Sequence, residues 1–247
     1  MDKVNILGVH VDMTGIDESA ERIEGFLDED RFHRVYTPNS EIIMMAYQDP
    51  EFCAMLNQAD LLTADGIGVV YASKILKKPI RQRAAGYDIA RKVLAYIAES
   101  GHTLFLFGSK PGVAEEAEAN LKRDYPGIRI VGRRNGYFKP EEESEIVEEI
   151  NASGAQLLFV CLGAPAQEKW IHRNADKLKV RVAMGIGGSL DVFAGRVERA
   201  PDFFCRTGLE WFYRLVKEPW RFMRMMALPK FALTVLAKGK KFEQDRD

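Results

Sequence analysis

The sequence has no hydrophobic run long enough to cross a membrane and no paired arrangement of cysteines. No stretch of the 247 residues reaches the roughly 18 uninterrupted apolar positions that a spanning helix needs. The first residues lack an apolar segment behind a basic start, so we expect no signal peptide. Cys53, Cys161 and Cys205 are odd in number and outside any Cys-x-x-Cys spacing, which argues against a disulfide framework or a zinc site. We therefore expect a cytoplasmic protein whose membrane contact is peripheral.

Motifs that bind a metal ion or a nicotinamide cofactor are also missing. The four histidines show no metal-ligand spacing, and the acid-x-acid triplets at 28–30 and 245–247 have the character of solvated charge. The glycine turn at 108–113 does not match the GxxxxGK[ST] phosphate loop, and the turn at 185–188 departs from GxGxxG at its last position. We expect neither a metal nor an organic cofactor.

Short apolar runs rich in β-branched residues alternate with longer amphipathic runs. This alternation is typical of β-α-β units around a mostly parallel sheet. The runs 104–107 and 157–160 are apolar at every position, as strands covered on both faces require. The expected strands are residues 4–9, 35–38, 61–64, 103–108, 129–131, 157–163 and 180–186. The expected helices are residues 17–27, 40–47, 50–58, 67–76, 87–99, 111–124, 141–151 and 165–175.

Glycines and polar residues gather where five of these strands end. Ligands of open parallel sheets bind just beyond the carboxyl ends of the strands. The sequence therefore predicts one binding cleft, formed by the turns at residues 37–39, 64–66, 108–109, 163–165 and 185–188.

Asp65 is the candidate general base. It follows the expected strand 61–64 and precedes Gly66, so a rigid strand holds it beside the cleft. An aspartate carboxylate, with a reference pKa of about 3.9, is ionised at neutral pH and can take a proton from a hydroxyl. The alternative is an N-cap for the helix that begins at residue 67, and the local residues alone favour this explanation.

Three further side chains have both a binding and a structural interpretation. Thr37 and Asn39 flank Pro38, which places a hydroxyl and an amide where they suit sugar hydroxyls or an acetamido group. Capping of the next helix by Asn39 or Ser40 is the alternative. Arg83 could grip a diphosphate through forked hydrogen bonds, and a solvated loop charge is the simpler explanation.

Two glycine turns are candidates for binding an anion. The turn at 108–113 follows a strand and opens a helix, whose N-terminal N–H groups and dipole favour negative charge. Similar turns end many strands that bind nothing. Gly187 and Gly188 form the second turn, and Asp191 follows it after two residues.

The composition changes near residue 200. Nine Lys or Arg and two acids give residues 203–241 a net charge of +7, whereas residues 1–202 sum to −6. Aromatic side chains and methionines are mixed with these cations, which is typical of an interfacial membrane helix, an RNA-binding surface or a helix packed on a partner. The acidic remainder and the lack of an RNA-binding motif argue against nucleic acid. We expect a core at 1–200 and a helical appendage at 201–247 that docks on an anionic membrane.

A series of short motifs runs through almost the whole chain. They are Thr-Pro-Asn-Ser-Glu at 37–41, Ala-Asp-Gly at 64–66, Gly-Tyr-Asp at 86–88, Leu-Phe-Gly at 106–108, Gly-Tyr-Phe at 136–138, Leu-Gly-Ala-Pro at 162–165, Gln-Glu-Lys-Trp at 167–170, Gly-Ile-Gly-Gly at 185–188, Arg-Ala-Pro at 199–201 and Gly-Leu-Glu-Trp at 208–211. In this order they resemble the WecG/TagA/CpsF family of glycosyltransferases, and most of all its TagA branch.

The resemblance implies a Rossmann-like core and a metal-independent, inverting sugar transfer. In the TagA branch the donor would be UDP-N-acetylmannosamine and the acceptor N-acetylglucosamine on undecaprenyl diphosphate, an early step of wall teichoic acid linkage-unit synthesis. The resemblance places the base at Asp65 and assigns catalytic positions to Thr37 and Asn39. The substrate-binding positions that it implies are Arg83, Gly108, Ser109, Gly136, Tyr137, Gly163, Gln167, Gly187, Gly188, Asp191, Arg214, Arg221 and Arg224.

Other functions are compatible with parts of the sequence. The same scaffold could use UDP-N-acetylmannosaminuronic acid or another UDP-hexose, because a fold does not determine its substrate. A nucleotide-dependent oxidoreductase and a non-catalytic membrane- or partner-binding module are alternatives from other classes. Apolar residues in the basic segment also permit a homo-oligomer. The expected location is peripheral, on the inner face of the cell membrane.

Overall fold

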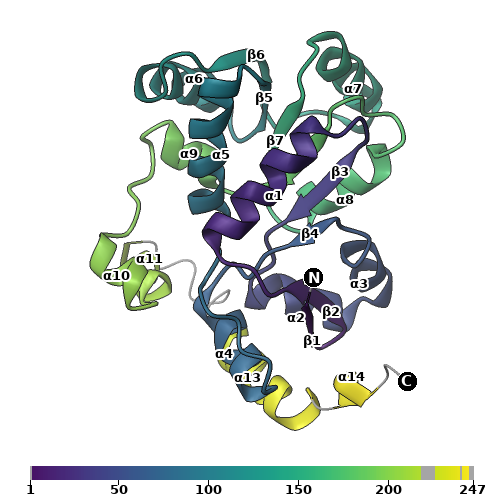
Figure 1. Cartoon of the computed structure of the whole chain (residues 1–247), viewed down its shortest axis with the longest axis vertical. Helices are drawn as coiled ribbons and strands as arrows, with labels where there is room; N and C mark the ends of the chain where they lie inside the picture. The colour runs from purple at the N-terminus through teal and green to yellow at the C-terminus, as the bar shows by residue number, and fades with distance from the viewer. Residues whose placement is uncertain (1, 218–225, 240, 245–247) are drawn as a thin grey trace.

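The computed structural model describes residues 2–217, 226–239 and 241–244. At its centre lies a six-stranded sheet in which every neighbouring pair of strands is parallel (Figure 1). In spatial order the strands are β4 (Leu61–Leu62), β3 (His33–Tyr36), β8 (Val182–Gly185), β7 (Leu157–Cys161), β5 (Thr103–Gly108) and β6 (Arg129–Arg134). The predicted α/β fold with a parallel sheet is confirmed.

The central strands are apolar on both faces because helices cover both sides of the sheet. Every residue of β5 and β7 is buried. Along β5, Leu104 and Leu106 contribute to one hydrophobic cluster and Phe105 and Phe107 to the other. This alternation follows from the two-residue period of a strand, and it confirms the predicted three-layer arrangement.

Each face of the sheet has its own set of helices. Figure 1 shows α1 (Ile16–Asp28) and α5 (Gly86–Ser100) running side by side across one face, where α6 (Val113–Asp124) and α9 (Ser189–Phe193) complete the cluster. The opposite cluster takes its helical side chains from α2 (Ser40–Gln48), α3 (Pro50–Leu56), α4 (Ile67–Ile75), α7 (Glu143–Ala152), α8 (Ala166–Asn174) and α13 (Ala227–Lys238).

The prediction of a single strand over residues 4–9 is wrong. The chain instead forms an antiparallel hairpin of β1 (Lys3–Ile6) and β2 (Val9–Asp12), separate from the main sheet. Leu7 and Gly8 make the turn, both with positive φ, at 54° and 98°. Two positive φ values are what a tight hairpin turn requires, but Leu rarely adopts one. The side chain of Asn5 supports the turn by accepting the N–H of Gly8 at 2.8 Å.

The C-terminal segment is helical and packs on the rest of the chain. It contains α10 (Asp202–Arg206), α11 (Glu210–Lys217), α13 and α14 (Lys241–Gln244). Helix α13 lies against α2 and α4, and its Phe231 and Val235 are buried in the cluster that α2 and α4 form. No helix in the described ranges is long and apolar enough to cross a membrane.

Candidate active site

A cleft of about 890 Å³ opens at the carboxyl ends of the parallel strands, the edge where such sheets bind ligands. The turns after β3, β4, β5, β7 and β8 all contribute to its wall, as the sequence predicted. The predicted site residues that line it are Thr37, Asn39, Asp65, Arg83, Ser109, Gly136, Tyr137, Gly163, Gln167, Gly187, Gly188 and Asp191. Gly108 precedes Ser109 in the chain and is not itself a lining residue.

Asp65 is the third residue after β4 and lies in the turn that leads into α4. Its backbone N–H donates to the carbonyl oxygens of Pro38 and Thr63, both at 3.1 Å, so the backbone here is anchored to the neighbouring strand end. The N-cap residue of helix α4 is Gly66, whose φ of 116° is open only to glycine. The N-cap explanation for Asp65 is therefore wrong, and its carboxylate belongs to the wall of the cleft.

Thr37 and Asn39 each combine a structural contact with a place in the cleft. The Oδ1 atom of Asn39 accepts the N–H groups of Glu41 and Ile42 at 2.9 and 3.1 Å, so Asn39 is the N-cap of α2. The hydroxyl of Thr37 donates to the carbonyl oxygen of Gly185 at 3.1 Å and ties the end of β3 to the end of β8. The helix-capping alternative is therefore confirmed for the side-chain oxygen of Asn39. The catalytic roles of Thr37 and Asn39 stay predictions.

The turn after β5 is held by neighbours on both sides. Gly108 has a φ of 130°, and a Cβ at this position would overlap the backbone of Cys161 on β7. The hydroxyl of the next residue, Ser109, donates to Oδ2 of Asp191 at 2.9 Å. The backbone carbonyl oxygen of Ser109 accepts the N–H of Gly136 at 2.8 Å. These contacts join the turns after β5 and β6 to α9, and they orient the Asp191 carboxylate at the cleft wall.

Gln167 is fixed at both ends of its amide. Its Oε1 accepts the N–H of Gly187 at 3.0 Å, and its Nε2 donates to Oε1 of Glu168 at 2.8 Å. A Cβ on Gly185 would lie 3.0 Å from Nε2, so the glycine at the end of β8 gives the amide its room. Gln167 is 2% exposed although it lines the cleft.

Glu168 was not singled out from the sequence. It is fully buried, and burial raises its pKa to about 7, although the hydrogen bond from Gln167 acts in the opposite direction. The sequence contains a signal for this burial, because Glu168 precedes Ile171 by three residues and so shares the apolar face of α8.

One ion pair connects the cleft to the C-terminal segment, and Asp88 and Arg199 extend the network beside it. Nη1 of Arg83 lies 2.5 Å from Oε2 of Glu210 on α11, and its Nη2 lies 3.6 Å from Asp88. Asp88 also pairs with Arg199 at 2.6 Å, and that guanidinium stacks over the ring of Tyr87. Burial lowers the pKa of Arg83, but Glu210, Asp65 and Asp88 outweigh it and raise the value. The solvated-charge explanation for Arg83 is therefore wrong.

The C-terminal segment forms part of the cleft wall, through Gly208, Glu210, Trp211, Tyr213, Lys217, Ala227 and Leu228. A Cβ on Gly208 would lie 2.8 Å from Ile67, so the α10–α11 turn sits directly on the start of α4. Arg214 lies on α11, and nothing is described of its side chain; Arg221 and Arg224 lie outside the described residues. In the described part of the chain no three His, Cys, Asp or Glu side chains are grouped to hold a metal ion.

The fold and the cleft define an α/β protein with a cleft at the carboxyl edge of a parallel sheet, where proteins of this class bind their ligands. The family model described as Glycosyl transferase WecG/TagA/CpsF family matches residues 4–245, and the chain belongs to this family. The expectation of a glycosyltransferase is thereby confirmed.

Three relatives that align over most of the chain bear the same name, N-acetylglucosaminyldiphosphoundecaprenol N-acetyl-beta-D-mannosaminyltransferase. The protein of Bacillus spizizenii is 42% identical over 211 residues, which is 85% of this chain and 81% of its own. That of Bacillus subtilis is 35% identical and covers 96% of this chain and 91% of its own. That of Staphylococcus aureus (strain MRSA252) is 34% identical and covers 97% and 94%.

Proposed function

We propose that this protein transfers N-acetylmannosamine from UDP-N-acetylmannosamine to N-acetylglucosamine on undecaprenyl diphosphate, with inversion and without a metal ion. The reaction would be an early step in making the linkage unit of wall teichoic acid. The name shared by relatives that align over most of the chain supports the donor and the acceptor. One observation carries the chemistry: the carboxylate of Asp65 and the glycine turns after β5, β7 and β8 line the same cleft.

The glycine turns are suited to the UDP half of the donor. The carboxylate of Asp191, oriented by Ser109, would accept hydrogen bonds from hydroxyl groups of the nucleotide. The turn at Gly187 and Gly188 would bring backbone N–H groups close to its diphosphate. The leaving UDP gains negative charge as the bond to the sugar breaks. Cations and N–H groups that are already in place stabilise such charge best, and we assign this role to Arg83 together with Arg214, Arg221 and Arg224.

Asp65 would act as the general base on the acceptor side. It takes the proton from the acceptor hydroxyl, whose oxygen forms a bond to the anomeric carbon on the face opposite UDP. The bond from that carbon to the diphosphate oxygen breaks, and UDP leaves with the electron pair. General-base assistance of this kind contributes about 10²–10⁴ in rate.

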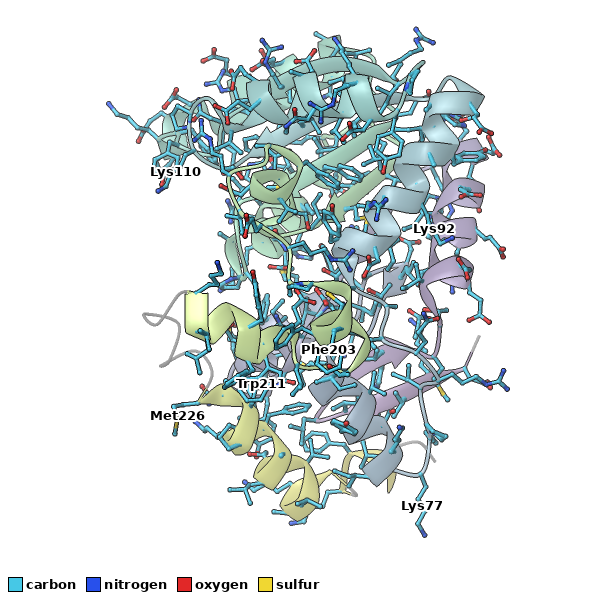
Figure 2. The ribbon with its side chains drawn as sticks, turned by 90° about the vertical axis from the view of Figure 1, so that its left-hand side faces the viewer. Lys77, Lys92, Lys110, Phe203, Trp211 and Met226 are labelled. Carbon is cyan, nitrogen blue, oxygen red and sulfur yellow. The ribbon has the colours of Figure 1, made fainter. Side chains whose placement is uncertain are left out.

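The docking surface is the apolar face of α4, α10, α11 and α13, and we propose that it rests on an anionic membrane. Most large hydrophobic side chains that are exposed in the described residues lie on these helices or at their ends; Tyr137 and Val197 lie elsewhere. Figure 2 shows Phe203, Trp211 and Met226 in the lower half of the view, all on this part of the molecule. Such a surface would bring the cleft to a lipid-bound acceptor.

The first experiment compares wild type with Asp65→Asn. Each is incubated with UDP-N-acetylmannosamine and a short-chain lipid-diphosphate N-acetylglucosamine in the presence of EDTA, and UDP release is measured. We expect wild-type turnover and a loss of about 10²–10⁴ in kcat for Asp65→Asn, because the amide cannot accept the proton. Asp28→Asn is the matched control, since Asp28 is 68% exposed and belongs to α1, outside the cleft.

Two results would contradict this proposal. Undiminished turnover by Asp65→Asn would remove the assigned base. If wild type releases no UDP, the next donors are UDP-N-acetylmannosaminuronic acid and other UDP-hexoses, and activity with one of them would replace the donor while keeping the reaction class.

A further inference from the structure

Glu168 is a buried acid without a cationic partner. It is 0% exposed, and no Lys, Arg or His among the described residues lies within ion-pair distance of it. Its Oε2 atom has no hydrogen-bond partner within that same part of the chain. Asp12, the other fully buried acid, differs because it lies 3.5 Å from Lys3 and 3.6 Å from Arg22. A buried carboxylate without a cation destabilises the folded state, so Glu168 requires an explanation other than stability.

The contacts of Glu168 lead directly to the cleft. Its Oε1 accepts from Nε2 of Gln167 at 2.8 Å, and the Oε1 of Gln167 accepts the N–H of Gly187 at 3.0 Å. The backbone N–H of Gly187 can only donate, so it selects the oxygen of the amide, and a carboxyl oxygen of Glu168 accepts from the amide nitrogen on the other side. Rotation of the Gln167 amide by half a turn would place its oxygen against a carboxyl oxygen of Glu168 and its N–H groups against the N–H of Gly187.

This orientation leaves one N–H of the Gln167 amide for a ligand. The amide nitrogen has two N–H bonds, and Glu168 is the acceptor of one of them. Gln167 lines the cleft beside the glycine turn, and its oxygen holds that turn at Gly187, where φ is 56°. The hydrogen bonds within the described residues give the second N–H no acceptor, and the diphosphate half of the donor has been assigned to the neighbouring turn.

We propose that Glu168 is a positioning residue for the donor: through the Gln167 amide it fixes the Gly187 turn and aims one N–H at an oxygen atom of the sugar nucleotide. This role rests on the proposed function, because it assumes that a nucleotide sugar occupies the cleft. It explains why a destabilising side chain occupies the first turn of α8. Glu168 touches no substrate itself; it acts by holding Gln167.

The test uses Glu168→Met, which keeps the length of the side chain and removes its charge and its acceptor. We expect the KM for the donor to rise about tenfold, as loss of one well-placed hydrogen bond implies, with the acceptor KM unchanged. The melting temperature should rise by about 4 °C, because the unpaired buried charge is gone. A role in packing alone would instead lower both stability and activity.

Three matched variants complete the design. Glu168→Gln keeps an oxygen that can accept from Gln167 and should keep the donor KM within about threefold of wild type. In a Gln167→Ala background, Glu168→Met should raise the donor KM no further, because its effect passes through Gln167. Asp12→Asn, the buried acid that does have cations, should lower stability and leave the donor KM unchanged.

The outcomes separate this inference from the proposed function. If wild type shows no transfer with any donor, the proposed function fails, and UDP binding measured by calorimetry still tests the effect of Glu168. If wild type is active and Glu168→Met keeps a wild-type donor KM, the positioning role is wrong. Additive effects of Glu168→Met and Gln167→Ala would also overturn it, as would a fall in melting temperature that parallels the loss of activity.

Discussion

At the scale of single residues, the cleft is built by side chains that each have a second, structural partner. Asn39 caps α2, Thr37 joins β3 to β8, and Ser109 holds Asp191. A capping motif and a sugar-binding motif use the same residue types, so the local sequence alone could not separate the two explanations. For Asp65 the local sequence favoured the cap, and the structure overturns it because Gly66 is the residue at the start of α4.

The ionisation of Glu168 makes the stability of the protein depend on pH. Burial raises its pKa to about 7, and the neighbouring phenol of Tyr36 stays neutral because burial raises its pKa as well. Between about pH 4.5 and about pH 7 the unfolded chain has lost this proton and the folded chain still holds it, so the folded state loses stability as pH rises.

Glu168→Gln removes that titration. The variant should match wild type near pH 4.5 and exceed it at pH 7 by up to about 3 kcal/mol in the free energy of unfolding. Denaturant titrations of both proteins at several pH values measure this difference. A difference in the free energy of unfolding that stays constant over this pH range would show that Glu168 does not titrate there.

At the scale of helices and strands, the apolar pattern predicted most of the fold. The interiors of β5 and β7 are apolar throughout, and helices of 7 to 15 residues lie between the strands. The hairpin was missed because Leu7 at the turn carries none of the usual signal of Gly or Asn. The contact between Arg83 and Glu210 was also missed, since nothing local relates side chains 127 residues apart.

That contact fastens α11 over the cleft. The side chains of Arg83 and Glu210 are 16% and 15% exposed, so water screens their attraction only in part. Glu210→Gln should therefore loosen α11 by about 1–2 kcal/mol in local opening free energy. Hydrogen exchange would show this as faster exchange of the α11 amides, with the amides of α5 unchanged.

The same segment provides a matched control. Glu198 lies 4.0 Å from Lys217 on α11 but is 83% exposed, so Glu198→Gln should leave exchange unaltered. Equal acceleration by both substitutions would mean that the buried pair has no special part in holding the helix.

At the scale of the whole molecule, the sharp change of composition near residue 200 does not coincide with a gap in packing. Phe231 and Val235 of α13 are as buried as the core residues of α2 and α4, against which α13 packs, although they belong to the basic segment. The sequence showed the charge of this segment but could not show which of its apolar residues face the core. The exposed ones, among them Leu233 and Leu236, lie on the side of α13 that we propose docks on a membrane.

The membrane-docking proposal predicts that charge matters on this side of the molecule and not on the other. Lys230 is exposed on α13, beside the apolar surface, whereas Lys92 lies on α5, in the upper right of Figure 2 and away from α13. A lysine at an anionic surface contributes about 1 kcal/mol, so Lys230→Glu, which also adds repulsion, should weaken binding to phosphatidylglycerol vesicles by about thirtyfold. Lys92→Glu changes the net charge equally and should leave vesicle binding nearly unchanged. If both substitutions weaken binding alike, attraction depends on total charge alone, and α13 is not the surface that docks.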